Sequence, residues 1–267
     1  MNISCLKKPV IGVFAVLAML SMAAVAKAGN DKTLVIATEG AWPPFNYVEP
    51  DGTIAGFEVD LGQAICKQMG VKCKFVIHDF STMVTAVAKH KYDLGMAGYN
   101  ATPERKKKVN FTDKYADPAP AVLVRKDSDI RSATDEGLSG KKLGVQPNSL
   151  HESYAEKHFP HAKLSLYEKT DEENLDLSIG RIDATMDDSV PQMEWLKTQG
   201  AACCKLLAVV PVDHELSGGG IGALVAKDRP QLLKRFNDAL AVIIENGTFK
   251  KLDDKYFPGV NIYGEPY

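Results

Sequence analysis

The sequence predicts an α/β protein of two lobes, each a sheet with flanking helices, joined by two crossing segments of the chain. Two series of alternating apolar strands and amphipathic helices, over residues 34–96 and 142–186, predict the two sheets. Between the two series, Pro118 and Pro120 limit helix formation and favour an extended crossover. Three consecutive glycines at 218–220 suit a return crossover or a flexible loop. The chain therefore leaves the first lobe, builds the second and returns.

The first series predicts strand, helix, strand, helix and strand, at residues 34–37, 57–70, 74–77, 81–88 and 93–96. Apolar residues recur at helical spacing between Phe57 and Met69, and Gly70 suits the end of that helix. Ser81 is predicted to cap the next helix. This order predicts parallel strands with right-handed crossovers.

The second series again alternates, with strands predicted at 142–145, 164–167 and 182–186. Two capping boxes predict where its helices begin, because a Ser or Thr three residues before a Glu can satisfy helix-start N–H groups. The boxes are formed by Ser149 with Glu152 and by Thr170 with Glu173.

The C-terminal part, residues 230–257, is predicted to be a helix interrupted at Gly247 and followed by a second helix. We assign residues 29–118 and 214–267 to a discontinuous lobe I and residues 119–213 to lobe II. A ligand is expected where the lobes face each other, and hinge closure is the expected motion.

The first 28 residues have the order of a secretory signal peptide. Lys7 and Lys8 precede an apolar run from Pro9 to about Val25, and Ala-Lys-Ala follows at 26–28. A transmembrane anchor is the alternative, but the apolar run is short for a bilayer span. We therefore expect an exported protein.

Without this segment the chain loses three lysines and keeps 29 Lys and Arg residues against 34 Asp and Glu, a formal charge of −5. Such a mildly acidic chain without a basic stripe is a poor nucleic-acid binder, because phosphate contacts dominate that affinity. No nucleic-acid partner is expected.

Four cysteines follow the signal segment, and an even number in an exported chain predicts disulfides. Cys66 lies in a predicted helix and Cys73 opens the strand after it, so that a bridge there would join helix to strand. Cys203 and Cys204 are adjacent, which leaves two free thiols and a strained vicinal bridge both open. No C-x-x-C zinc motif is present, and no metal is expected.

The segment after Met96 carries the strongest chemical indication. Thr102 is a good N-cap, Pro103 fits the first helical position and Glu104 suits the first turn. Arg105 is thereby placed in a first helical turn near the carboxyl end of a strand, where α/β proteins bind ligands. Its guanidinium could hold a carboxylate through two parallel hydrogen bonds, helped by helix-start N–H groups. The alternative is a solvated arginine in a basic surface run.

The chain resembles the polar and basic amino-acid-binding proteins of bacterial ABC importers, solute-binding family 3. The segments that carry the resemblance are ATEGAWPPFNY, GFEVDLGQAICKQMG, YDLGMAGYNATPERKKKVNFTDKY, GKKLGVQPNS, NLDLSIGRIDATMDD and NGTFKKLDDKYF. It is most similar to the arginine-, lysine/arginine/ornithine- and histidine-binding members. The resemblance implies a two-lobe periplasmic-binding-protein fold of type II with a two-stranded hinge. It also implies a Cys66–Cys73 disulfide, whereas Cys203 and Cys204 have no counterpart that we can place.

By this resemblance Arg105 holds the ligand carboxylate, Asp188 receives the α-ammonium group, and Ser149 lies near the carboxylate. A zwitterion needs a cation and an anion, and buried charges must be paired, so the two lobes would supply both only on closure. The alternative for Asp188 is a helix N-cap beside Asp187.

The resemblance also places Trp42 over the ligand side chain, Phe80 opposite it, and Glu39 at an acidic position used for basic side chains. Trp42 could contact a cationic group through its ring face. The alternatives are a core aromatic beside Pro43 and Pro44, and a solvent-exposed loop acid at 39.

Ala97, Gly98 and Asn100 fall on the loop that contacts ligand before the arginine. Some relatives have serine here, so this chain offers fewer hydroxyls, and Gly98 still has its backbone N–H. His151, His158 and His161 are near one another in sequence and are interpreted as surface histidines rather than as a metal site.

The sequence therefore predicts a periplasmic solute-binding protein that delivers a basic amino acid, namely arginine, lysine, ornithine or histidine, to the membrane permease of an ABC importer. No catalysis and no cofactor are expected, and a monomer is the family expectation. One alternative is an exported enzyme on the same fold, similar to cyclohexadienyl dehydratase, with Glu39 or Asp188 as a general acid. Another is a protein that binds an opine or a neutral polar amino acid.

Overall fold

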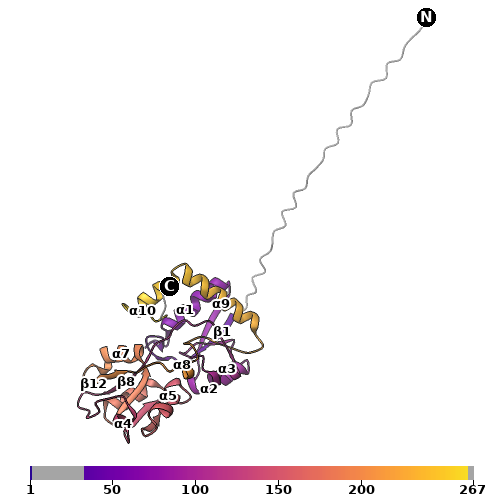
Figure 1. Ribbon diagram of the computed structural model, residues 1–267. Coiled ribbons are helices and arrows are strands. Elements are labelled where there is room, and N and C mark those ends of the chain that lie inside the picture. Colours follow the sequence, from indigo (N-terminus) through magenta and orange to yellow (C-terminus); the bar gives the residue numbers. More distant parts are fainter. Residues whose placement is uncertain (2–32, 264–267) are drawn as a thin grey trace.

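The computed structural model describes Met1 and residues 33–263 of the chain. The predicted signal peptide, residues 1–28, lies outside the described residues apart from Met1. Figure 1 shows two lobes, one with α1, α9 and α10 and the other with α4, α5, α7 and β12. We keep the names lobe I and lobe II for the parts that hold the first and the second sheet. The residue bounds that the sequence analysis assigned to the two lobes remain predictions.

The sheet of lobe I has the order β5-β1-β6-β13-β7. β1 runs parallel to β5 and β6, as the alternating pattern predicts, whereas β13 returns from the far end of the chain and is antiparallel to both neighbours. Its strands are β1 Thr33–Thr38, β5 Lys72–Ile77, β6 Leu94–Gly95, β7 Asn110–Phe111 and β13 Leu224–Val225. A small antiparallel sheet follows β1 and consists of β2 Ala41–Trp42, β3 Asn46–Val48 and β4 Ile54–Ala55.

The helices of lobe I are α1 Phe57–Met69, α2 Phe80–Ala88, α3 Pro103–Lys108, α9 Pro230–Glu245 and α10 Thr248–Tyr256. α1 ends at Gly70, whose φ of 68° lies in the left-handed region that glycine tolerates. α9 and α10 are separated at Gly247, as predicted, and pack with α1 over a core of large side chains such as Phe57, Phe236 and Phe249.

The sheet of lobe II has the order β10-β9-β11-β8-β12. Its strands are β8 Pro120–Arg125, β9 Lys142–Val145, β10 Lys163–Leu166, β11 Ala184–Asp188 and β12 Cys204–Val209. Its helices are α4 Asp135–Leu138, α5 Leu150–His158, α6 Thr170–Ser178, α7 Ser189–Lys197 and the 3-10 turn η1 Gln199–Ala201. The segment with Pro118 and Pro120 does pass between the lobes, from the bridge of Ala116 with Ile221 in lobe I to β8 in lobe II. The short helix α8 His214–Ser217 precedes the three glycines of the return segment.

Two predicted helix starts are wrong. α2 begins at Phe80 with Asp79 as its N-cap, because Asp79 already has extended backbone angles, and Ser81 instead bonds Glu168 across the lobes at 2.9 Å. α6 has Lys169 as its N-cap, and the Thr170 hydroxyl donates to the Ala41 carbonyl of lobe I at 3.0 Å. In both places the hydroxyl group that was predicted to cap a helix instead forms a hydrogen bond to the other lobe.

The Ser149 cap is correct: its hydroxyl accepts from the Glu152 N–H at 3.0 Å. The Glu152 side chain returns to the N–H of Asn148 rather than of Ser149, at 2.6 Å, so the box is shifted by one residue.

Both cysteine pairs are bonded. Cys66 and Cys73 join the end of α1 to β5, with their Cα atoms 6.1 Å apart, which confirms the predicted staple. Cys203 and Cys204 form a vicinal disulfide at the start of β12, which settles the alternative that the sequence left open.

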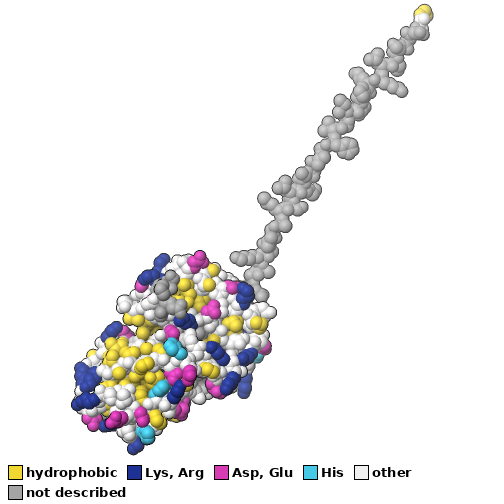
Figure 2. Space-filling view, viewed as in Figure 1, with side chains coloured by type: hydrophobic (Ala, Val, Ile, Leu, Met, Phe, Trp, Pro, Cys, Tyr) yellow, Lys and Arg dark blue, Asp and Glu magenta, His cyan; other side chains and the backbone are white. Residues whose placement is uncertain are grey.

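Lys, Arg, Asp and Glu side chains are mixed over the face seen in Figure 2, and apolar side chains gather over α7 and β12 of lobe II. Within residues 33–263, none of the helices combines the length and the apolarity that a bilayer span requires.

Candidate functional site

A pocket between the lobes brings together all nine residues that the sequence predicts to bind ligand. Lobe I contributes one wall and lobe II the other, around a cavity of about 20 Å³, and four further residues complete the lining. The predicted residues are Glu39, Trp42, Phe80, Ala97, Gly98, Asn100, Arg105, Ser149 and Asp188, and the additional ones are Gln146, Leu150, His151 and Asp187. Their proximity is a structural finding, and their roles toward a ligand stay a prediction.

Arg105 is positioned by the start of α3. Thr102 caps that helix, and its hydroxyl accepts from the Arg105 N–H at 3.2 Å. The guanidinium lies 5.4 Å from the ring centre of Phe80 and 4.9 Å from that of Tyr99, and these two rings stack on each other. Aromatic faces favour a cation at this distance. The side chain is therefore held in one orientation by its own lobe.

Arg105 is 7% exposed, and its guanidinium donates to two carbonyl groups, that of Asn100 at 2.9 Å and that of Asn148 in lobe II at 2.7 Å. Among the described residues, no carboxylate forms an ion pair with it. Burial lowers the pKa of Arg105 to about 10, so it keeps its charge at neutral pH. A buried guanidinium without an anion is a site that favours an anionic group.

The loop before α3 fits closely against Trp42. Gly98 has a φ of 66°, and a Cβ atom there would lie 2.5 Å from the Trp42 ring, so only glycine fits. Its N–H, which we expected to be free for a ligand, donates to the buried carboxylate of Glu58 at 2.9 Å. Gly98 thus shapes the pocket and does not offer that donor.

Trp42 belongs both to the core and to the pocket. Its ring stacks on Phe45 with centres 4.3 Å apart, which agrees with the core alternative. Its indole N–H crosses the cleft and donates to Asp187 Oδ2 at 2.9 Å. The bond joins lobe I to lobe II.

The wall of lobe II ends β11 with two adjacent carboxylates and faces them with a histidine. His151 Nε2 lies 3.1 Å from Asp188 Oδ1, and His151 Nδ1 lies 3.6 Å from Asp187 Oδ1. Asp188 is the N-cap residue of α7 but makes no side-chain capping bond, so its carboxylate is directed to the cleft cluster rather than to the helix.

Burial raises the pKa of Asp187 to about 6, and burial also raises that of Asp188, although the bond from His151 opposes this. Burial alone would lower the pKa of His151, but the bond and charge of Asp188 and the charge of Asp187 outweigh it, so the pKa is raised. Near neutral pH this wall therefore contains groups that gain or lose protons.

Glu39 closes the other end of the cavity, following β1. Gln146 of lobe II donates to its Oε1 at 2.6 Å and also bonds the Glu168 carbonyl at 2.9 Å. Burial raises the pKa of Glu39 to about 8, partly offset by the bond from Gln146, and the charge of Asp187 adds to the rise. The solvent-exposed alternative for Glu39 is wrong, because the residue is 6% exposed.

Among the described residues, His151, Asp187 and Asp188 form a cluster of possible metal ligands. Their nitrogen and oxygen ligand atoms lie within 4.8 Å of one another. Their contacts are accounted for by the bonds to each other and to Trp42, so we treat the cluster as a hydrogen-bonded network. The expectation that no metal is bound stays an expectation.

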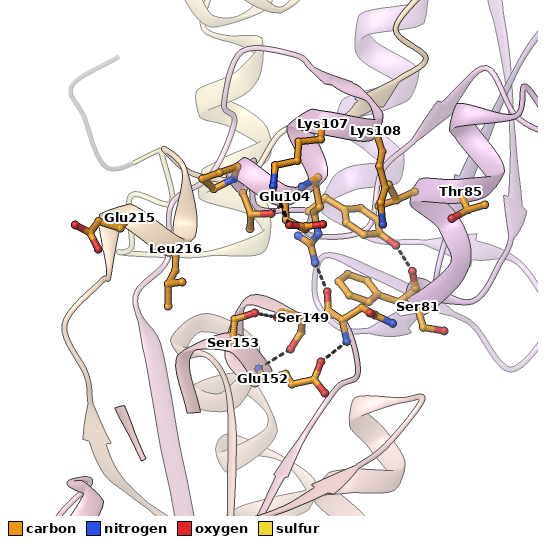
Figure 3. Close-up of a pocket in the computed structure, with 17 residues that line it drawn as sticks. Ser81, Thr85, Glu104, Lys107, Lys108, Ser149, Glu152, Ser153, Glu215 and Leu216 are labelled. Atoms are coloured by element: carbon orange, nitrogen blue, oxygen red, sulfur yellow. Dashed lines mark hydrogen bonds and ion pairs between the residues drawn. The ribbon is translucent and has the colours of Figure 1, made fainter. Parts of the chain in front are cut away.

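A larger groove of about 370 Å³ adjoins the pocket and shares Phe80, Arg105 and Ser149 with it. Figure 3 shows Lys107 and Lys108 of α3 on one side of this groove and Ser149, the N-cap residue of α5, on the other. The groove is partly open to solvent, and Arg105 lines both the groove and the pocket.

The interpretation of His151 as a surface histidine is wrong. It is 6% exposed, because its place in the first turn of α5 directs it into the cleft, whereas His158 lies further along and pairs with Asp213 at 2.8 Å. Its position two residues after the predicted cap Ser149 could have indicated this. Asp187 could have been found as the neighbour of Asp188, but Gln146 and Leu150 gave no comparable indication.

Two sheets that face each other across such a pocket define the two-lobe periplasmic-binding-protein fold of type II. The model of the bacterial extracellular solute-binding proteins, family 3, matches residues 34–259, and the chain belongs to this family. It is similar to an L-arginine-binding protein of Pseudomonas aeruginosa, with 35% identity over 248 residues that cover 92% of this chain and 95% of the relative.

Two solved structures show the same architecture. One is an ancestral arginine-binding protein bound to arginine, with a TM-score of 0.78, 33% identity, and coverage of 84% of this chain and 98% of that one. The other is an ancestral amino acid-binding protein described as a precursor of cyclohexadienyl dehydratase, with a TM-score of 0.75, 31% identity, and coverage of 84% and 95%.

Proposed function

We propose that this chain is a periplasmic binding protein that captures a free amino acid with a cationic side chain, arginine first, for an ABC importer. The observation that carries the proposal is the buried guanidinium of Arg105, which has no anionic partner within residues 33–263 and faces two carboxylates across the cleft. An α-carboxylate would pair with Arg105 and an α-ammonium group with Asp188. Two relatives of Escherichia coli, an ABC transporter arginine-binding protein and a lysine/arginine/ornithine-binding periplasmic protein, support the ligand class, the periplasmic location and the link to an ABC importer.

The preference for a cationic side chain rests on charge. The pocket holds the carboxyl groups of Glu39, Asp187 and Asp188 against the cationic groups of Arg105 and His151. An additional positive charge on the ligand would pair with Glu39, whose carboxyl group is otherwise costly to ionise. The ring of Trp42 lies against this region and favours a guanidinium or ammonium group.

Calorimetric titration of residues 29–267 with a panel of free amino acids tests the proposal. The panel contains arginine, lysine, ornithine, histidine, glutamine and glutamate, together with octopine and nopaline. We expect a Kd of about 1 μM or tighter, equivalent to about −8 kcal/mol, for at least one basic amino acid. Tighter binding of glutamine or of an opine would contradict the ligand class, and absence of binding to every compound would contradict the function.

Glu39→Gln sharpens the test because it removes the charge and keeps the shape. We expect this substitution to weaken the binding of arginine more than the binding of glutamine. The exposed Glu136→Gln is the matched control and should change neither affinity.

A second candidate function is dehydration of a prephenate-type substrate. It is favoured by the raised pKa of Glu39, which would keep a proton available for a leaving hydroxyl, and by the likeness to the dehydratase precursor. Release of phenylpyruvate from prephenate, followed by absorbance, would establish it, and a rate equal to that without protein would exclude it.

A further inference from the structure

His151 contacts a carboxylate that a zwitterionic ligand would also need for its ammonium group. Its imidazole is buried in the first turn of α5 and contacts the carboxylate of Asp188 at 3.1 Å. Asp188 is also the group to which the proposed function assigns the ammonium group of the ligand. One carboxylate is therefore shared between a titratable cation of the protein and a fixed cation of the ligand.

Charged groups reach this cluster from every element that packs against it. Asp187 and Asp188 come from β11, and Arg105 comes from α3 of lobe I. Asp117, in the segment before β8, acts on Asp188. Glu39, which follows β1, is near enough to Asp187 for each charge to affect the other, and Glu173 of α6 is also affected by Asp187. Burial raises the pKa of both Glu39 and Glu173, so the charged imidazole is favoured by Asp188 and Asp187 and opposed by Arg105.

The bonding of Asp187 leaves Asp188 as the principal partner of the histidine. Asp187 Oδ2 accepts from Trp42 Nε1 at 2.9 Å, and its Oδ1 accepts from the Asp188 N–H at 2.7 Å. Asp188 has the shorter contact to His151. A second cation at Asp188 would thus lie beside the imidazole, with no other carboxylate equally near.

We propose that the imidazolium of His151 is the resident counter-ion of Asp188, and that an incoming ammonium group replaces it, so that ligand binding releases a proton from His151. The inference rests on the proposed function, because it needs an amino acid whose ammonium group binds Asp188. Two like charges beside one carboxylate repel strongly in a buried site, and the imidazole can relieve this by losing its proton, whereas the ammonium group of an amino acid keeps its own.

The pKa of His151 is raised above its usual value before binding and falls when the ammonium group arrives. Between these two pKa values, binding releases a proton, so affinity increases with pH by up to about tenfold per pH unit. At pH values above the ligand-free pKa of His151, this residue no longer makes the ligand affinity depend on pH.

The experiment is titration calorimetry with L-arginine at pH 6.5, repeated in buffers of different ionisation enthalpy, which yields the number of protons released. Glu39 and Asp187 also release protons when a cation arrives, so the decisive quantity is a difference between variants. His151→Gln should release up to about one proton fewer than the native protein and should flatten the rise of affinity with pH. His158→Gln, on the same helix and paired with Asp213 outside the cleft, is the matched control and should match the native protein.

A measurement on the native protein covers the case in which His151→Gln does not fold. Nitrogen-15 NMR of the histidine rings gives the pKa of His151 with and without arginine, and we expect it to fall on binding. Binding with an unchanged pKa, or with equal proton release in His151→Gln, would overturn this inference and leave the proposed function standing. Absence of any arginine binding at pH 5–8 would overturn both.

Discussion

The two walls of the cleft carry opposite charges and are built in different ways. In lobe I, Arg105 is fixed by the cap at Thr102, by the Asn100 carbonyl and by two aromatic rings, and it keeps its charge at every physiological pH. In lobe II, Asp187, Asp188 and His151 share protons and have shifted pKa values. The guanidinium of Arg105 is permanently charged, whereas the cluster of lobe II adjusts its charge.

This difference assigns separate tasks to the walls. A carboxylate meets the same cation whatever the pH, so recognition of that end should vary little. The ammonium end meets a cluster whose net charge depends on pH and on what is bound. Affinity and its pH dependence should therefore be separable by variants in different lobes.

The largest expected effect is on the wall of lobe I. Arg105→Ala removes the cation that is proposed to hold the carboxylate and leaves that carboxylate buried without a partner, a loss of about 3–5 kcal/mol. Arginine binding should then be undetectable by calorimetry at micromolar protein. Arg131→Ala, an exposed arginine of lobe II, controls for loss of charge alone. Retained micromolar affinity in Arg105→Ala would remove the proposed clamp.

The two adjacent acids of lobe II should differ from each other. Asp188→Asn is expected to weaken arginine about 100-fold, or about 2.7 kcal/mol, because the ammonium group loses its charged partner. Asp187→Asn keeps an oxygen that can accept from the Trp42 N–H, and it should weaken arginine binding only about threefold. Calorimetric Kd values for both variants decide the order, and equal losses would mean that the carboxylates act as one unit.

The same contrast explains how far the sequence could lead. The cap at Thr102, the proline at 103 and the strand before them are local features, so the position of Arg105 at a helix start was predictable. The partition into two alternating series likewise predicted three neighbouring strands of each sheet, β5-β1-β6 and β10-β9-β11. These inferences needed only neighbours in sequence.

Contacts between the lobes could not be predicted in that way. Ser81 and Thr170 look like helix caps until Glu168 and Ala41 of the opposite lobe are brought beside them. His151 looks like a surface residue of a polar helix until β11 places two carboxylates next to it. In each instance a long-range contact competed with a local preference and prevailed.

Glu39, on the wall of lobe I, is a further titratable group of the cleft and can be tested without ligand. Its pKa is about 8 when folded and near 4.5 when unfolded, so the folded protein holds a proton that the unfolded chain has lost. Stability should fall as pH rises from about 4.5 to about 8, by about 2–3 kcal/mol, since opening of the cleft would hydrate the carboxylate and limit the cost. Glu39→Gln should therefore have a higher Tm than the native protein at pH 8 and not at pH 4. Parallel pH profiles of Tm for the two proteins would contradict this.

A smaller effect than that of Asp188→Asn is expected where the two walls touch directly. Trp42→Phe keeps a ring to stack on Phe45 but removes the N–H that joins lobe I to Asp187 at 2.9 Å. Loss of one buried hydrogen bond to a charged group should weaken arginine binding by about 1.5 kcal/mol, or about tenfold, mainly through faster dissociation. The chain has two tryptophans, so any change of fluorescence on binding is expected to come from Trp42 and to vanish in this variant. Trp195→Phe, in the body of lobe II, is the matched control and should keep both the affinity and the fluorescence change. Unchanged dissociation in Trp42→Phe would mean that the walls are held together by the ligand and the remaining contacts, with no contribution from the indole N–H.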